Sequence, residues 1–118
     1  MSTPEGKVKL FIDTRMKEWF PNAVKYSPPG VGRFGKNGFP DRIWWIKGND
    51  TFSISVCIEA KAEGKQATCL QLKTLIDLRN QGCLVAVVAG KDKEKMDNIR
   101  QHILERIRLI NEVFPEDS

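Results

Sequence analysis

The sequence is poor in the side chains that bind zinc or act as cysteine–histidine nucleophiles. Its single histidine, His102, lies in a helical pattern with charged residues around it, so we expect a helix-surface residue rather than a metal ligand. The three cysteines, Cys57, Cys69 and Cys83, are odd in number and too widely spaced for a zinc pair or a disulfide framework. Cys57 and Cys83 lie in or beside apolar runs and are expected to be buried or half-buried free thiols. These features argue against zinc chemistry and against a Cys–His nucleophile.

Long apolar runs and targeting signals are also lacking. No run approaches the roughly 20 apolar residues that span a bilayer. The N-terminal residues 1–5 show no basic region followed by an apolar stretch, as a secretory signal would. With 118 residues, 41% of them hydrophobic, and no low-complexity tract, the chain fits one compact domain over 1–118. We expect a soluble, cytoplasmic protein with no membrane partner.

The net charge of +4 and the isoelectric point near 9.1 suit a polyanionic partner such as nucleic acid. Many basic proteins bind no nucleic acid, so the charge matters only if an active site indicates the same partner.

Hydrophobic patterning and turn signals predict seven elements in the order α-β-β-β-α-β-α. They are a helix that begins at Thr3-Pro4-Glu5 and stops at Phe20-Pro21, strands over 24–27, 42–47 and 52–61, a helix over 68–80, a strand over 84–89 and a helix over 93–112. A loop rich in glycine and proline over 28–38 precedes the second strand, and a hairpin turn around Gly48 follows it. The 84–89 strand is continuously apolar, as in a strand covered on both faces. The helix after residue 68 has four apolar positions, Leu72, Leu75, Ile76 and Leu78.

Three charged residues on neighbouring predicted strands are the main candidates for an active site. Glu59 and Lys61 are two apart on a strand, so both side chains leave the same face, while Ala60 faces the core. Asp41, preceded by Pro40, starts the previous strand. If the two strands pair through the turn around Gly48, Asp41 and Glu59 could approach each other at one end of the sheet.

Two carboxylates and an ammonium group in one small volume suit phosphodiester hydrolysis. Carboxylate oxygens are the ligands that Mg²⁺ and Mn²⁺ prefer. A bound cation can polarise a phosphodiester and stabilise the leaving oxygen, and a lysine beside it could orient the attacking water or offset the phosphate charge. Taken singly, a Glu-x-Lys is more often a solvated charge pair, and a Pro-Asp is usually a turn. Their joint occurrence on adjacent strands is far more specific.

Glu5 and Gln71 each have a structural interpretation and a functional one. Glu5 suits the positive end of a helix and could form a capping box with Ser2. It also shares a face with Val8, where a carboxylate needs a partner or a metal. Gln71 fits a capping box with Thr68, but its helix directly follows the Glu-x-Lys strand, so it could also face the same cleft.

Basic and aromatic side chains near these residues are candidates for contacts with nucleic acid. Arg33 and Lys36 lie in the glycine-rich loop before Asp41, and Lys65 precedes the second helix, so all three could contact phosphates. Trp44 and Trp45 are adjacent on a strand, so one should face inward and the other outward. Packing under a helix is the simpler interpretation of this pair, and base stacking is the alternative.

Five segments together resemble the VRR-NUC branch of the PD-(D/E)XK nuclease superfamily. They are Pro4-Glu5-Gly6-Lys7-Val8, Gly38-Phe39-Pro40-Asp41, Ile58-Glu59-Ala60-Lys61, Thr68-x-x-Gln71, and Gly82 before a hydrophobic strand. They occur in the family's order, and the resemblance runs from the helix start at Pro4-Glu5 to the strand that ends near Gly90, about three quarters of the chain. Phe39 is bulkier than the aliphatic residue more usual before the proline, a departure expected to alter local packing rather than the chemistry.

The resemblance implies a restriction-endonuclease-like α/β fold, with an αβββαβ core whose mixed central sheet is flanked by helices, followed by a C-terminal helix. It further implies Mg²⁺- or Mn²⁺-dependent cleavage of DNA, often of branched, flap or four-way-junction structures. Carried over by position, Glu5, Asp41, Glu59 and the backbone carbonyl of Ala60 would be metal ligands, Lys61 the catalytic lysine and Gln71 a supporting residue.

Short stand-alone members of this family are typical of bacteriophages and bacteria and can form homodimers, which implies the host cytoplasm for a phage-encoded chain. The function expected from the resemblance is that of a structure-selective DNA endonuclease. Two alternatives stay open: a non-catalytic nucleic-acid-binding module with the same fold, and a nuclease subunit that needs a partner.

Overall fold

The helices and strands follow the order that the sequence pattern predicts. The computed structural model describes residues 3–28 and 38–116. Over these residues the elements are α1 (Pro4–Trp19), β1 (Val24–Tyr26), β2 (Arg42–Lys47), β3 (Ser53–Lys61), α2 (Cys69–Asn80), β4 (Leu84–Ala89) and α3 (Lys93–Val113). The predicted α/β class, with an αβββαβ core and a C-terminal helix, is confirmed.

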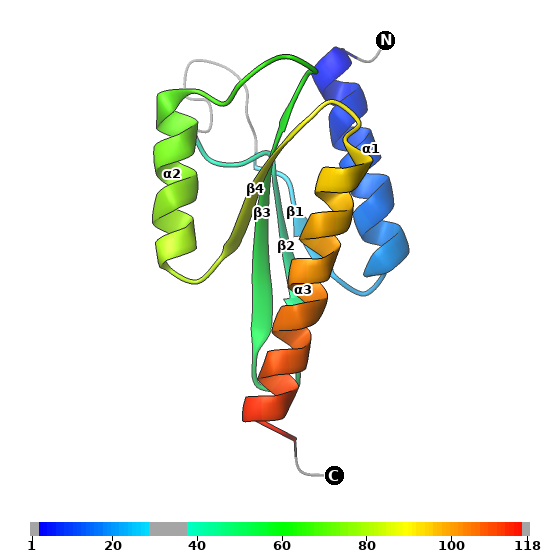
Figure 1. Cartoon of the computed structure of the whole chain (residues 1–118), viewed down its shortest axis with the longest axis vertical. Coiled ribbons are helices and arrows are strands. Elements are labelled where there is room, and N and C mark those ends of the chain that lie inside the picture. Colours follow the sequence, from blue (N-terminus) through cyan, green and yellow to red (C-terminus); the bar gives the residue numbers. More distant parts are fainter. Residues whose placement is uncertain (1–2, 29–37, 117–118) are drawn as a thin grey trace.

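The four strands form one mixed sheet in the order β1-β2-β3-β4 (Figure 1). β1 pairs with β2 and β2 with β3 in antiparallel fashion, the second pair through the hairpin at Gly48. β3 and β4 run parallel, connected through α2. The carboxyl end of β3 therefore lies at the same end of the sheet as the start of β2, where Asp41 enters.

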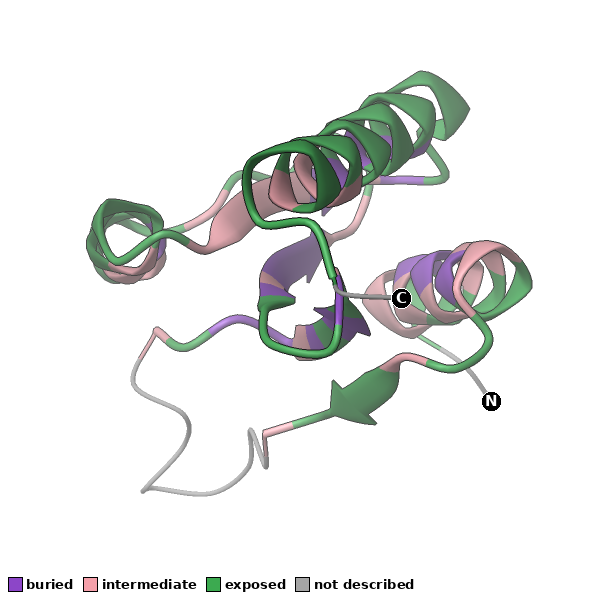
Figure 2. Ribbon diagram, turned by 90° about the horizontal axis from the view of Figure 1, so that it is seen from below, coloured by how far each residue is buried: buried purple, intermediate pink, exposed green. Residues whose placement is uncertain are grey.

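Helices cover both faces of the sheet. Figure 1 shows α2 on one side and α1 together with α3 on the other. The main core fills the space between the sheet and the helices α1 and α3. Its buried residues are among the purple segments of Figure 2. Its buried side chains are Val8, Ile12, Met16, Trp44, Ile46, Ile54, Val56, Ile58, Ala60, Val88, Met96, Ile99 and Ile103.

The packing of α2 is looser than its sequence suggests. Of its four apolar positions, Leu75 is buried and Leu78 is half-buried, but Leu72 and Ile76 are exposed. The apolar character of these four positions therefore does not mean that all four are buried. Among the described residues, α2 is the only helix on its face of the sheet, where it packs chiefly against β4, so only one side of the helix is covered. β4 itself contacts α2 and α3, as expected for a strand covered on both faces.

The burial of Cys57, Cys83 and His102 agrees with their surroundings in the sequence. Cys57 is buried and Cys83 half-buried, while His102 and Cys69 are exposed. Burial, together with the adjacent Cys83 thiol, raises the pKa of the Cys57 thiol to about 12. No helix over the described ranges has the length and apolar character needed to cross a membrane.

Candidate metal-dependent active site

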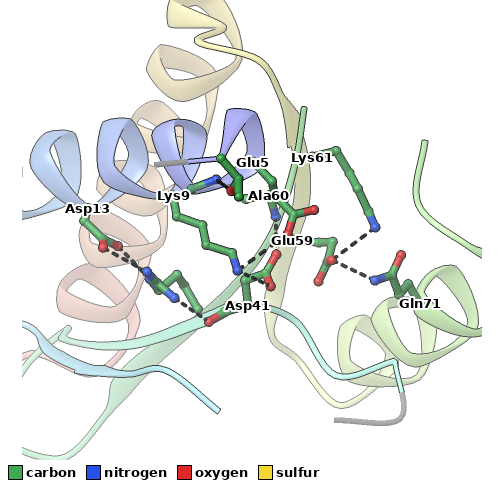
Figure 3. Close-up of polar contacts among 11 residues, drawn as sticks. Glu5, Lys9, Asp13, Asp41, Glu59, Ala60, Lys61 and Gln71 are labelled. Atoms are coloured by element: carbon green, nitrogen blue, oxygen red, sulfur yellow. Dashed lines mark hydrogen bonds and ion pairs between the residues drawn. The ribbon is translucent and has the colours of Figure 1, made fainter. Parts of the chain in front are cut away.

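The pairing of β2 with β3 brings Asp41 to the end of β3. The register places Arg42 opposite Ile58, so Asp41 lies one step further, level with Glu59. The Asp41 carboxylate accepts a hydrogen bond at Oδ2 from the backbone N–H of Ala60, with an N···O distance of 2.7 Å. The predicted approach of Asp41 and Glu59 at one end of the sheet is therefore present (Figure 3).

Both carboxylates are nearly removed from solvent. Asp41 is 4% exposed and Glu59 is 1% exposed. An ionised carboxylate in such surroundings is costly unless positive charge or hydrogen-bond donors lie against it. Lysines meet this need: Lys61 Nζ lies 3.6 Å from Glu59 Oε2, and Lys9 Nζ lies 3.5 Å from Asp41 Oδ1.

Strand alternation explains how Glu59 and Lys61 come to share a face. Both leave β3 toward the side that α2 covers, while Ala60 between them is fully buried on the opposite side, as predicted. The Lys61 side chain is 14% exposed, so it is largely but not fully removed from solvent. An exposed cross-strand charge pair, the simpler interpretation of Glu-x-Lys, does not describe this arrangement.

Gln71 forms the predicted capping box and also contacts Glu59. Thr68 is the N-cap of α2, and its hydroxyl accepts a hydrogen bond from the Gln71 backbone N–H. The Gln71 side-chain oxygen accepts in turn from the Thr68 backbone N–H at 2.8 Å, which completes the capping box. The other end of the same amide donates from Nε2 to Glu59 Oε2 at 2.8 Å. Capping and a place in the site are therefore compatible.

Glu5 lies at the margin of the site and not in its interior. Its side chain is 40% exposed, whereas Val8 on the same helix is 3% exposed, so the Glu5 carboxylate is only partly buried, and Lys9 forms an ion pair with it. Glu5 lies in the first turn of α1. Thr3 is the N-cap and bonds the Gly6 N–H. A capping box with Ser2 would require Ser2 as the N-cap, and that residue lies outside the described part of the chain.

A charged network that the sequence reasoning missed reaches the site from α1. Arg42 donates from Nε and Nη2 to the Asp13 carboxylate, at 2.9 and 3.2 Å, and from Nη1 to the backbone carbonyl of Asp41 at 3.1 Å. Asp13 thus fixes Arg42, and Arg42 fixes the backbone that carries Asp41. The signal for this network was the spacing of Glu5, Lys9 and Asp13, which follow one another every four residues along one side of the helix.

The donors of the site suit a hard divalent cation, although they do not form a complete set of metal ligands in this arrangement. Within 3–28 and 38–116, no group of three or more His, Cys, Asp or Glu side chains is placed to hold a metal ion. In this arrangement the chain's own ammonium and amide groups lie against the carboxylates. The donor set is nevertheless all oxygen, with two nearly buried carboxylates from neighbouring strands, which is the chemistry that Mg²⁺ and Mn²⁺ prefer.

The residues predicted to contact nucleic acid are only partly described. Lys65 is exposed in the turn before α2, whereas Arg33 and Lys36 lie outside the described residues. Trp44 is buried in the core and Trp45 is exposed on the opposite face of β2, so the predicted alternation of the pair is confirmed. Packing accounts for Trp44, and stacking of a base on Trp45 stays a prediction.

Comparisons of the chain with models of protein families, with curated proteins and with solved structures found no significant match. What the site does must therefore follow from its own donors, charges and burial.

Proposed function

We propose that this chain is a metal-dependent DNA endonuclease that hydrolyses phosphodiester bonds with Mg²⁺ or Mn²⁺. One observation carries the proposal: the nearly buried carboxylates of Asp41 and Glu59 lie at one sheet end together with the ammonium group of Lys61. Such desolvated charges contribute little to stability, because the cost of removing them from water offsets their attraction. Their concentration at one point is typical of functional sites.

Each residue of the site has a definite task in this proposal. Asp41 and Glu59 would hold the cation, with Glu5 and the Ala60 carbonyl as the further ligands implied by the family resemblance. The Ala60 N–H orients the Asp41 carboxylate, and the Gln71 amide orients that of Glu59. A bound divalent cation would polarise the phosphodiester and stabilise the leaving oxygen. Lys61 places its ammonium group where it can orient the attacking water or offset the charge developing on the phosphate.

Two features of the sequence support DNA as the substrate. The net charge of +4 favours a polyanion, and the five segments that resemble the VRR-NUC nucleases include every residue assigned a task above. The preference for branched, flap or four-way-junction DNA, and assembly as a homodimer, rest on that resemblance alone.

The test is a cleavage assay on single-stranded, duplex, flap and four-way-junction DNAs in Mg²⁺ and in Mn²⁺. Wild type is expected to cut at least one branched substrate, and EDTA is expected to abolish the cut. Lys61→Ala and Asp41→Ala should each lower the cleavage rate by about 100- to 1000-fold, because each removes charge that acts on the transition state. Far-UV circular dichroism checks that the variants are folded.

Lys47→Ala is the matched control for Lys61→Ala. Lys47 ends β2 at the opposite end of the sheet and also pairs with a carboxylate, that of Asp50, but it is well exposed. Its loss should leave the cleavage rate unchanged. Wild-type rates in folded Lys61→Ala and Asp41→Ala would refute the mechanism, and tight DNA binding with no metal-dependent cleavage would favour the non-catalytic binding module.

A further inference from the structure

Lys9 is placed between two of the carboxylates assigned to the cation. Its Nζ lies 3.5 Å from Glu5 Oε2 and 3.5 Å from Asp41 Oδ1. Figure 3 shows the side chain extending from α1 toward the carboxylate of Asp41. One ammonium group thus bridges an acid of the same helix and an acid that precedes β2.

This bridge supplies positive charge that the carboxylates need in the arrangement described. Asp41 is nearly buried, and Glu5 adds a second negative charge within reach of the same ammonium group. Without a cation, the two acids would repel each other in a region of reduced dielectric constant. Lys9 therefore contributes to stabilising this arrangement of acids.

The same contacts are weak enough to be exchanged. The Lys9 side chain is 30% exposed, and both of its contacts are ion pairs at 3.5 Å rather than short hydrogen bonds. Partly exposed ion pairs of this kind contribute little net free energy and leave a long side chain able to move. A divalent cation carries twice the charge of the Lys9 ammonium group and binds carboxylate oxygens more strongly.

We propose that Lys9 is the resident counter-cation of the Glu5–Asp41 pair, and that it must leave these carboxylates for a divalent cation to bind both. Lys9 then lowers the affinity for the metal while keeping the metal-free site folded. The inference rests on the proposed function, since it takes Glu5 and Asp41 as metal ligands. It makes Lys9 a positioning residue of the site and not a catalytic one.

The experiment measures Mn²⁺ binding to the full chain by isothermal titration calorimetry, in the absence of DNA. In Lys9→Met the competing ammonium group is gone, and its repulsion of the incoming cation is gone as well. The Mn²⁺ dissociation constant should therefore fall by about three- to tenfold relative to wild type. Lys9→Arg, which keeps the charge, should bind Mn²⁺ no more tightly than wild type.

Thermal unfolding provides a second measurement. It distinguishes a lysine that competes with the metal from one with a purely structural role, whose loss would lower the melting temperature equally with and without Mn²⁺. In EDTA, Lys9→Met should melt below wild type, because the two acids lose one of the positive charges that lie against them. In saturating Mn²⁺ the difference should shrink, because the metal replaces the missing charge. Lys73→Met is the matched control: Lys73 makes an exposed ion pair with Asp77 four residues along α2, a helix that carries neither Glu5 nor Asp41. Its melting difference should be the same in both buffers.

The outcomes separate this inference from the function on which it rests. Mn²⁺ binding by wild type that Lys9→Met leaves unchanged or weakens would overturn the role of Lys9 alone. A wild-type chain that binds neither Mn²⁺ nor Mg²⁺ would overturn both. If Lys9→Met does not fold, Lys9→Gln serves in its place, since it keeps a polar side chain but removes the charge.

Discussion

Gln71 uses the two ends of one amide for two different purposes. The oxygen accepts from the Thr68 backbone N–H, and the nitrogen donates to the Glu59 carboxylate. The first bond belongs to the start of α2, and the second belongs to the site. Substitutions can therefore separate the structural contribution of this residue from its functional one.

We expect Thr68→Ala and Gln71→Ala each to lower the free energy of unfolding by about 0.5–2 kcal/mol, because each removes half of the capping box. Gln71→Ala alone should also lower the DNA cleavage rate by about 10- to 100-fold, because the Glu59 carboxylate loses the donor that orients it. Urea denaturation and cleavage rates in saturating Mn²⁺ measure the two effects. Equal cleavage rates in the two folded variants would leave capping as the whole role of Gln71.

For single residues of the site, strand spacing sufficed to predict that Glu59 and Lys61 share a face. The hairpin at Gly48 sufficed to predict that Asp41 approaches Glu59. The spacing of Glu5, Lys9 and Asp13 indicated a charged side of α1, but not that this side meets Asp41 and Arg42. Both contacts join α1 to the start of β2, and a single sequence does not specify which charges meet across elements. The exposure of Glu5 escaped prediction because helical periodicity gives the face of a residue but not how far the sheet extends beneath it.

Among the elements, the segment that leads into β2 is held by a close approach to the first turn of α2. Gly38 has a φ of +86°, and a Cβ atom there would lie 3.0 Å from the Leu70 carbonyl oxygen and 2.8 Å from Leu70 Cγ. A side chain is thus disfavoured both by the left-handed backbone and by contact with α2. Asp41 follows three residues later, so this approach helps to set where the carboxylate enters the site.

Gly38→Ala should therefore lower the free energy of unfolding more than the same substitution at a glycine that has a similar backbone conformation but no neighbouring atoms. Gly64 is that control: its φ is +81°, and nothing lies within 4 Å of the position of a Cβ atom. We expect Gly64→Ala to lower the free energy of unfolding by about 1–2 kcal/mol, and Gly38→Ala by about 1–3 kcal/mol more. Guanidinium denaturation of both variants measures the difference. Equal losses would show that the contact with Leu70 relaxes at little cost.

The bounds of the helices and strands were predictable because capping residues, prolines and apolar periodicity act locally. Thr3 and Thr68 begin helices as N-caps, and Pro21 follows the end of the first. The exposure of Leu72 and Ile76 was not predictable, because their apolar character alone does not reveal that only one helix covers that face. How much of a helix is buried depends on its neighbours, which local patterns do not specify.

Over the whole molecule, the site and a buried polar junction at Asn49 lie at opposite ends of the sheet. Between Ser53 and Glu59, β3 spans about 20 Å at roughly 3.3 Å per residue. At the far end from the site, the β2–β3 turn is tied to the residues after α3 through Asn49, which is buried. Its Nδ2 donates to the carbonyl of Phe114, and its Oδ1 accepts from the backbone N–H groups of Thr51 and Phe52. Aromatic contact between Phe52 and Phe114, with ring centroids 4.8 Å apart, reinforces the junction.

This separation predicts that stability can be lowered at the turn without loss of chemistry at the site. Asn49→Ala should lower the free energy of unfolding by about 2–3 kcal/mol, because buried backbone groups lose their partners. Asn80→Ala, at the exposed end of α2, should change it by less than about 0.5 kcal/mol. Measured well below the melting temperature of Asn49→Ala, its cleavage rate should equal that of wild type, because Asp41, Glu59 and Lys61 keep their register at the other end of β3. A fall in cleavage while the variant stays folded would instead mean that the sheet transmits strain from the turn to the site.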